Sequence, residues 1–171
     1  MYQHILLAVA LQHWEEPSPH ALAAREAAVA LAKGTGAQLS VLSVYDYEKL
    51  EAPNLPAEEL GRYRETQMSQ IDALMAEKMQ TFLAGVQARN LSITPLLKVG
   101  GPRELIVTTA ETLGADLLVI GAHSKRRFLD ALLGGTAAAV SRRAPCAVAM
   151  VQPGEKGPIL QTSDMGESLP S

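Results

Sequence analysis

Short, almost wholly apolar runs alternate along the chain with longer segments in which apolar and polar residues are mixed. Apolar runs of this length are typical of strands in a parallel sheet that is covered on both faces. We predict five such strands, at His4–Val9, Gln38–Tyr45, Leu91–Val99, Asp116–Ile120 and Cys146–Val151. Pro95 indicates that the third strand lies at an edge, because proline lacks the N–H that a central strand donates.

The mixed segments carry the apolar spacing and the end signals of helices. We predict four helices, at Pro19–Lys33, about Ala57–Arg89, Arg103–Leu113 and Thr136–Arg143. Ser18 precedes the first helix as a capping residue, Pro19 begins it, and Gly34 and Gly36 mark its end. The long second helix has apolar residues at roughly helical spacing, which is enough for one buried stripe. They are Ile71, Leu74, Met75, Met79, Phe82 and Val86.

Strands that alternate with helices imply βαβ units. The predicted fold class is therefore α/β, a doubly wound five-stranded parallel sheet with helices on both faces. We assign residues 1–151 to this single domain. From Gln152 the composition shifts to Pro, Gly, Ser and acidic residues, and we interpret residues 152–171 as a flexible C-terminal tail.

Composition limits which partners and which cellular compartment we expect. The net charge of −3 gives no reason to expect nucleic acid or a membrane surface as a partner. The one cysteine, Cys146, excludes an internal disulfide and suits a reducing compartment, and we interpret it as a small core residue. No apolar run has the length of a membrane span, and the N-terminus lacks the basic flank of a signal peptide. We therefore expect a cytoplasmic protein. We expect no bound metal, because the histidines are not spaced as metal ligands.

The loop from Gly121 to Thr136 is the best candidate for a functional site, because ligands of open parallel sheets bind beyond the carboxyl ends of the strands. Gly134 and Gly135 precede a helix, where free N–H groups and the helix dipole favour an anion. Lys125, Arg126 and Arg127 add positive charge to this loop. A phosphate clamp and a solvated surface are both open interpretations of that charge.

This segment resembles the universal stress protein family. That family has Gly-x-x-Gly, nine residues and then Gly-Ser or Gly-Thr, and the chain has Gly121, Ser124, nine residues, Gly134 and Gly135. Three further stretches, HILLAVA, KVGGPRELIVTTAETLGADLLVIG and RRAPCAVAMV, resemble other parts of the family in the right order. The resemblance covers roughly Tyr2 to Val151 and implies the strand order 3-2-1-4-5.

The resemblance also implies a ligand, an adenine nucleotide of the ATP or AMP type, which is not a required cofactor. Carried over to this chain, the implied contact positions are Ala10, Val44, Val99, Gly100, Gly121, Ser124, Lys125, Arg126, Gly134, Gly135 and Thr136. Three of them depart from the nucleotide-binding members. Ala10 stands where those members carry an Asp that contacts the nucleoside, Ser124 replaces the second glycine, and Gly135 replaces a hydroxyl residue.

Three hypotheses for the function remain open at this point. The first is a non-enzymatic stress-response module that binds an adenine nucleotide weakly. The second is a protein-binding dimer of the same family with a degenerate nucleotide loop. The third, a slow nucleotide hydrolase, ranks last because Asp130 is the only acid in the loop and no base is positioned beside it. We therefore expect no enzyme activity.

Two further expectations concern surfaces. The run Cys146–Val151 is apolar and ends the predicted sheet, so we expect a homodimer through this edge, unless the tail from Gln152 folds back and covers it. Trp14 lies on the loop after the first strand, at the presumed mouth of the site. Stacking on a base and capping of the adjacent core are both open interpretations of Trp14.

Overall fold

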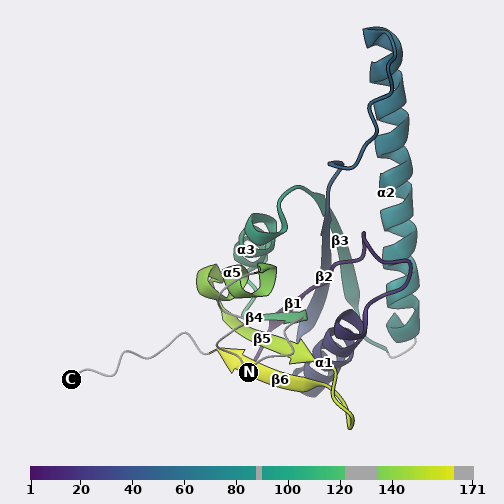
Figure 1. Ribbon diagram of the computed structural model, residues 1–171. Coiled ribbons are helices and arrows are strands. Elements are labelled where there is room, and N and C mark those ends of the chain that lie inside the picture. Colours follow the sequence, from purple (N-terminus) through teal and green to yellow (C-terminus); the bar gives the residue numbers. More distant parts are fainter. Residues whose placement is uncertain (88–89, 122–134, 164–171) are drawn as a thin grey trace, which may run out of the picture.

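The computed structural model of the chain describes residues 1–87, 90–121 and 135–163. Its sheet has the order β3-β2-β1-β4-β5-β6, and the first five strands are parallel, as predicted (Figure 1). The strands are β1 (His4–Ala8), β2 (Gln38–Tyr45), β3 (Ile93–Val99), β4 (Leu117–Gly121), β5 (Ala147–Gln152) and β6 (Ile159–Ser163). The predicted edge position of the strand with Pro95 is confirmed.

Helices α1 (Pro19–Thr35) and α2 (Ala57–Gln87) cover one face of the sheet, and α3 (Pro102–Leu113) and α5 (Thr136–Arg143) cover the other (Figure 1). The predicted cap of α1 is confirmed, because the Ser18 hydroxyl accepts a hydrogen bond of 3.1 Å from the Ala21 amide. The helix ends at Gly36, whose φ of 74° is the left-handed conformation that glycine adopts at low cost.

Two apolar clusters, one on each face, explain why the central strands are apolar throughout. On β1, Ile5 and Leu7 pack under α1 and α2, whereas Leu6 and Ala8 pack under α3 and α5. Successive residues of a strand point to opposite faces, so both sets must be apolar when both faces are covered. Cys146 is buried in the second cluster, and burial raises the pKa of its thiol, in agreement with a core role.

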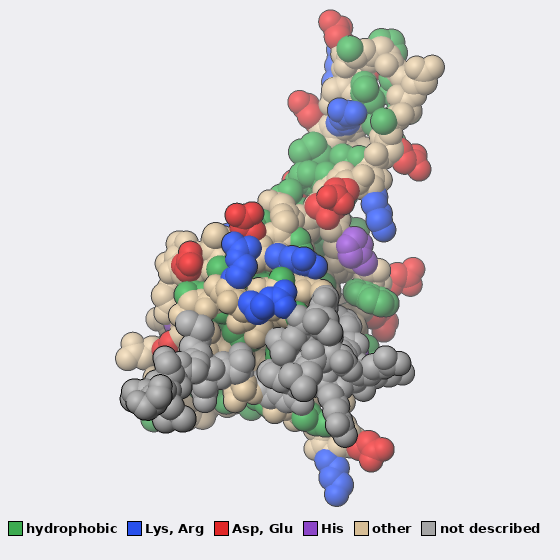
Figure 2. Space-filling model, turned by 60° about the vertical axis from the view of Figure 1, so that its left-hand side comes forward, with side chains coloured by type: hydrophobic (Ala, Val, Ile, Leu, Met, Phe, Trp, Pro, Cys, Tyr) green, Lys and Arg blue, Asp and Glu red, His purple; other side chains and the backbone are tan. Residues whose placement is uncertain are grey.

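Helix α2 is longer than the sheet that it covers, and its N-terminal part projects beyond the body of the molecule (Figure 1). Residues 57–74 include no buried side chain, and burial begins at Met75. The predicted buried stripe is correct for Met75, Met79, Phe82 and Val86, but it is wrong for Leu74, whose side chain is 47% exposed. The projecting part carries apolar side chains and charged side chains of both signs (Figure 2).

Strand β6 corrects the prediction that the chain beyond Gln152 is a flexible tail. Residues 159–163 pair with β5 in antiparallel register, from Gln152 opposite Ile159 to Val148 opposite Ser163. The predicted edge position of Cys146–Val151 is therefore wrong as well, because β6 takes the backbone hydrogen bonds that a free edge would offer to another chain. The alternative, that the chain beyond Gln152 folds back and covers this edge, is confirmed. The dimer itself stays a prediction, and residues 164–171 lie outside the described part.

In the part of the chain that the structure describes, no helix combines the length and the apolar character needed to cross a bilayer.

Candidate functional site

A pocket of about 650 Å³ opens at the carboxyl ends of β1, β2 and β4. It is bounded by those strand ends, by the first turns of α1, α3 and α5, and by the loop between β1 and α1. Ligands of open α/β sheets bind in this position, and the volume is typical of a small-molecule site. The structure brings six of the predicted contact positions to this pocket. They are Ala10, Val44, Gly100, Gly121, Gly135 and Thr136.

The part of the pocket next to the sheet is apolar. Its lining includes Ala8 at the end of β1, Leu42 and Val44 of β2, Ile106 of α3 and Ile120 of β4. Side chains of this kind suit a flat, weakly polar group and offer no charge to pair with. This part of the pocket can therefore hold an aromatic ring or a base.

Another part of the pocket lining is the N-terminus of α5. Gly135 precedes the helix with φ 113° and ψ 168°, and as a glycine it has no side chain that could cap the first turn. The Ala139 amide donates to the Gly135 carbonyl at 3.2 Å, which closes the first turn of the helix. The earlier amides of this turn are the groups that bind anions at helix N-termini. In the described part of the lining there is no Lys or Arg, and the N-terminus of α5 contributes positive potential there.

Gly121 lies at the end of β4, where the strand comes close to the start of α1. A Cβ at this position would lie 3.2 Å from the His20 carbonyl oxygen and 3.3 Å from the His20 Cβ. Those contacts are tighter than ordinary van der Waals contact, so a larger residue would require the start of α1 to shift by a few tenths of an ångström. Glycine at this position keeps both His20 and the strand end in the lining.

The loop between β1 and α1 forms one wall of the pocket, and Gln12 ties it to β2. The Gln12 side-chain amide donates to the Asp46 carbonyl at 2.7 Å, and the Asp46 amide donates back to the Gln12 side-chain oxygen at 3.0 Å. This reciprocal pair spends both polar atoms of Gln12 on the backbone. Gln12 therefore shapes the pocket and keeps one side-chain N–H, the second of its amide group, for a ligand.

Lys78 of α2 fixes the same loop from the other side. Its ammonium group donates three hydrogen bonds, to the carbonyl oxygens of Leu11 at 3.0 Å, Gln12 at 3.0 Å and Trp14 at 2.7 Å. An ammonium has three donors, so all of them are used here. The loop is thus held between β2 and α2 before any ligand arrives.

Replacing Lys78 with Met is expected to lower the free energy of unfolding by about 1–3 kcal/mol, because three carbonyls lose a charged donor while the apolar stem is kept. Amide hydrogen exchange in residues 11–15 should become faster at the same time. Lys33→Met is the matched control on an exposed lysine, and it should change neither quantity. Unchanged exchange in Lys78→Met would show that the three hydrogen bonds do not order the loop.

Some predicted contact positions are not brought to the pocket. Val99 is 44% exposed and does not line it. Its register partner on β2 is Tyr45, whose hydroxyl donates to Asp72 of α2, so Val99 shares the α2 face of the sheet. The other four predicted positions, Ser124, Lys125, Arg126 and Gly134, lie outside the described residues.

The structure adds residues that the sequence did not single out as ligand contacts. They come from the loop after β1, the first turn of α1 and the end of β2, and they are Gln12, His13, Ser18, His20, Tyr45 and Asp46. The only available signal was their position after predicted strands. Trp14 lies on the same loop but outside the pocket lining, so stacking on a base in this pocket is not supported.

Comparison with known families assigns the chain. The model described as "Universal stress protein family" matches residues 1–152, and the chain belongs to this family. A search of the curated proteins finds no match.

Solved structures agree on the fold. The chain is similar to hypothetical protein MJ0577, with 21% identity, TM-score 0.66 and coverage of 88% of this chain and 95% of that one. It is also similar to a universal stress protein in complex with cAMP, with 22% identity, TM-score 0.56 and coverage of 88% and 97%. A universal stress protein from Archaeoglobus fulgidus in complex with dAMP has 19% identity, TM-score 0.55 and coverage of 88% and 98%.

Proposed function

We propose that this universal stress protein binds an adenine nucleotide in the pocket at the carboxyl ends of β1, β2 and β4. The observation that carries the proposal is the pairing of an apolar part next to the sheet with a helix N-terminus that begins at a glycine, in one volume of about 650 Å³. Two solved structures with the same fold are complexes with cAMP and with dAMP, which supports an adenylate as the ligand class.

The base belongs in the apolar part, between Val44 of β2 and Ile120 of β4, and the phosphate belongs at the first turn of α5. This orientation places each part of the ligand beside the matching chemistry. An adenine buries an apolar ring, and a phosphate accepts hydrogen bonds from backbone N–H groups at the positive end of a helix. Thr136, the first residue of α5, lies at the phosphate position.

We propose that binding is weak. Ala10 lines the pocket after β1 and offers no carboxylate to the nucleoside, and the Asp46 backbone already pairs with the side-chain oxygen and one amide N–H of Gln12. One missing hydrogen bond to a charged group is worth roughly 1.5–3 kcal/mol, which corresponds to about one to two decades of affinity. A monophosphate therefore binds with an affinity well below that of a site with the full set of contacts.

We propose that the protein binds the nucleotide without turning it over. The one carboxylate in the described part of the lining is that of Asp46, at the end of β2, and its Oδ1 accepts from the Glu48 amide at 3.1 Å. The phosphate position lies across the pocket beside α5. Incubation of the protein with ATP should release no inorganic phosphate beyond the rate in buffer, and release that depends on Asp46 would assign a hydrolase instead.

The orientation predicts how Thr136→Glu will change binding. A carboxylate in the first turn of α5 is compatible with the helix dipole but repels a phosphate at the same place, so AMP should bind roughly tenfold more weakly. Adenosine lacks the phosphate and should bind the variant and the wild-type protein alike. Titration calorimetry with AMP and with adenosine measures both effects.

Thr136→Gln is the matched control, because Gln has the size of Glu without its charge. It should leave AMP binding close to that of the wild-type protein. If Gln weakens AMP as much as Glu does, the phosphate does not lie at α5. If AMP, cAMP and ATP all fail to bind the wild-type protein up to about 1 mM, the proposed function itself is wrong.

A further inference from the structure

A second, smaller hollow lies on the other side of the loop between β1 and α1. It has a volume of about 180 Å³ and is formed by this loop and by one face of α2. We name it the Trp14 groove. Its lining residues are Leu11, Trp14, Glu15 and Pro17 from the loop and Leu74, Glu77, Lys78 and Thr81 from α2.

The groove exposes apolar surface that the core does not need. Trp14 is 50% exposed and Leu74 is 47% exposed, although both are large apolar side chains. Leu74, Glu77, Lys78 and Thr81 recur at intervals of three or four residues, so they form one stripe of α2 beneath the loop. Tryptophan is one of the residue types that are enriched at the centres of protein interfaces.

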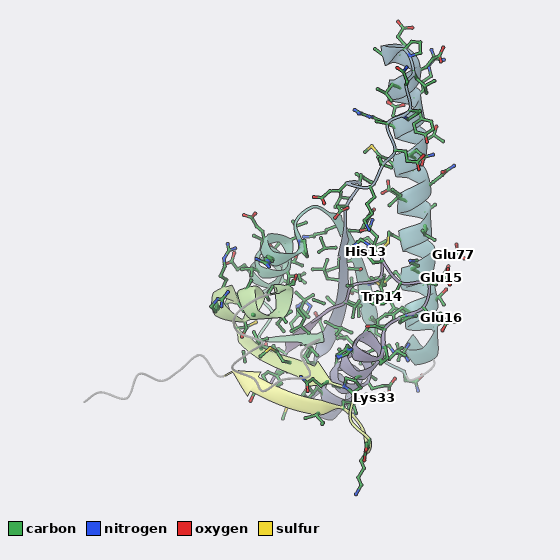
Figure 3. All side chains as sticks on the ribbon, viewed as in Figure 1. His13, Trp14, Glu15, Glu16, Lys33 and Glu77 are labelled. Atoms are coloured by element: carbon green, nitrogen blue, oxygen red, sulfur yellow. The ribbon has the colours of Figure 1, made fainter. Side chains whose placement is uncertain are left out.

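The sides of the groove are acidic. Figure 3 shows Glu15, Glu16 and Glu77 together on the outer side of α2, with Lys33 well away from them at the lower end of α1. In the part of the chain that the structure describes, none of these three glutamates forms a salt bridge, and the salt bridge that is present joins Arg25 to Glu26. Their charges are therefore available to an incoming group.

Lys78 also lines the groove, but its ammonium does not pair with the carboxylates of Glu15 and Glu77. Its ammonium directs all three of its donors to the carbonyl oxygens of Leu11, Gln12 and Trp14, on the inner side of the loop. The same hydrogen bonds fix the backbone that carries Trp14 and Glu15. The groove is thus ordered in advance, which reduces the entropy lost when a partner binds.

We propose that the Trp14 groove is a docking site for a basic segment of a partner protein, with one Lys or Arg side chain in the groove. The complementarity is specific. The apolar stem of a long basic side chain packs along Leu74 and Pro17, its cation meets Glu15 and Glu77, and Trp14 offers an aromatic face to either part. The small volume admits one long side chain and excludes a nucleotide or a helix.

The test uses fluorescence polarisation with two labelled peptides of defined sequence. One is Gly-Leu-Arg-Lys-Leu-Gly, and the other has Gln at both basic positions. The full-length wild-type protein should bind the basic peptide at least about tenfold more tightly than the Gln peptide. Added salt should weaken the binding, because exposed charges are screened.

Variants locate the site. Trp14→Ala, and separately Glu15→Gln with Glu77→Gln, should each weaken binding of the basic peptide by roughly fivefold or more. The matched control is Glu58→Gln with Glu59→Gln, which removes the same charge from the first turn of α2, far from the groove. It should leave the affinity unchanged. Thermal melting checks that all variants are folded, which is expected because the replaced side chains are exposed.

Three outcomes would overturn the proposal. Equal binding of the two peptides would show that the groove does not select a cation. An equal loss in the Glu58 and Glu59 control would assign the effect to overall acidity. Self-association of the wild-type protein that Trp14→Ala abolishes would assign the groove to a second copy of this chain. None of these results depends on whether the pocket beyond β1 binds a nucleotide.

Discussion

A chain that ends at Gln152 is expected to self-associate at concentrations where the full chain does not. Without β6, the N–H and C=O groups along β5 lose the partners that run from Val148 opposite Ser163 to Gln152 opposite Ile159. The exposed strand is AVAMVQ, which contains no charge and no proline to discourage pairing with another chain. Two copies can then pair about a twofold axis through their β5 strands. Sedimentation velocity across a dilution series measures this change directly.

A chain that ends at Ser163 is the matched control, because it loses only residues 164–171 and keeps β6. It should behave like the full chain. If the chain ending at Gln152 stays monomeric at high protein concentration, β6 does not protect the edge. If the full chain already forms a dimer that survives the loss of β6 unchanged, the interface lies elsewhere on the molecule.

Phe82→Ala is expected to lower the free energy of unfolding by about 3–5 kcal/mol, a large part of the total stability of a small domain. Phe82 is 1% exposed and packs in the cluster between α1, α2 and the sheet. The Arg25 guanidinium lies 5.2 Å from the centre of its ring and donates to the Phe82 carbonyl at 2.7 Å. Removal of the ring therefore leaves a cavity and takes away the aromatic partner of a largely buried cation.

Urea denaturation of the variant measures this loss, with Leu74→Ala as the control on the same helix. Leu74 is 47% exposed, and its truncation should change the stability by no more than about 0.5 kcal/mol. An equally small loss of stability in Phe82→Ala would mean that the C-terminal half of α2 is not packed on the sheet as described.

The central part of the fold could be predicted because burial on both faces leaves a clear pattern in the sequence. On β1 and β4 every residue that faces either apolar cluster must itself be apolar, and runs such as HILLAV and DLLVI show this directly. The signals that mark the helix ends were also local in the sequence. Pro19 begins α1, and the Ser18 hydroxyl caps it by accepting a hydrogen bond from the Ala21 amide, three residues further along the chain.

Strand β6 was missed because its pattern is weak and its environment is not local. Residues 159–163 form a short strand on the outside of the sheet, where no continuous apolar run is required. A turn signal was present. Gly154 and Gly157 bracket a tight reversal in which a Cβ on Gly154 would lie 2.5 Å from the Gly157 carbonyl oxygen. Glycines of this kind before an Ile-Leu pair indicate a hairpin as readily as a tail.

Only part of the site could be predicted, because some of its features are local in the sequence and others are not. Gly121, Gly135 and Thr136 form a pattern in the sequence, and the structure brings them to one pocket. Gln12 and Lys78 shape the same pocket through hydrogen bonds between residues 34 and 66 positions apart, which no local spacing reveals. Leu74 illustrates the opposite error, because helical spacing shows which residues share a face and not how far the covering sheet extends.

The loop between β1 and α1 has the pocket on one side and the Trp14 groove on the other. Gln12 and His13 line the pocket, and Leu11 and Trp14 line the groove. Ligands that share a wall influence each other whenever either one requires the wall to move. Thermodynamic linkage then makes the coupling reciprocal, so each ligand changes the affinity of the other by the same factor. In this protein, a nucleotide in the pocket and a basic side chain in the Trp14 groove would be separated by a single loop.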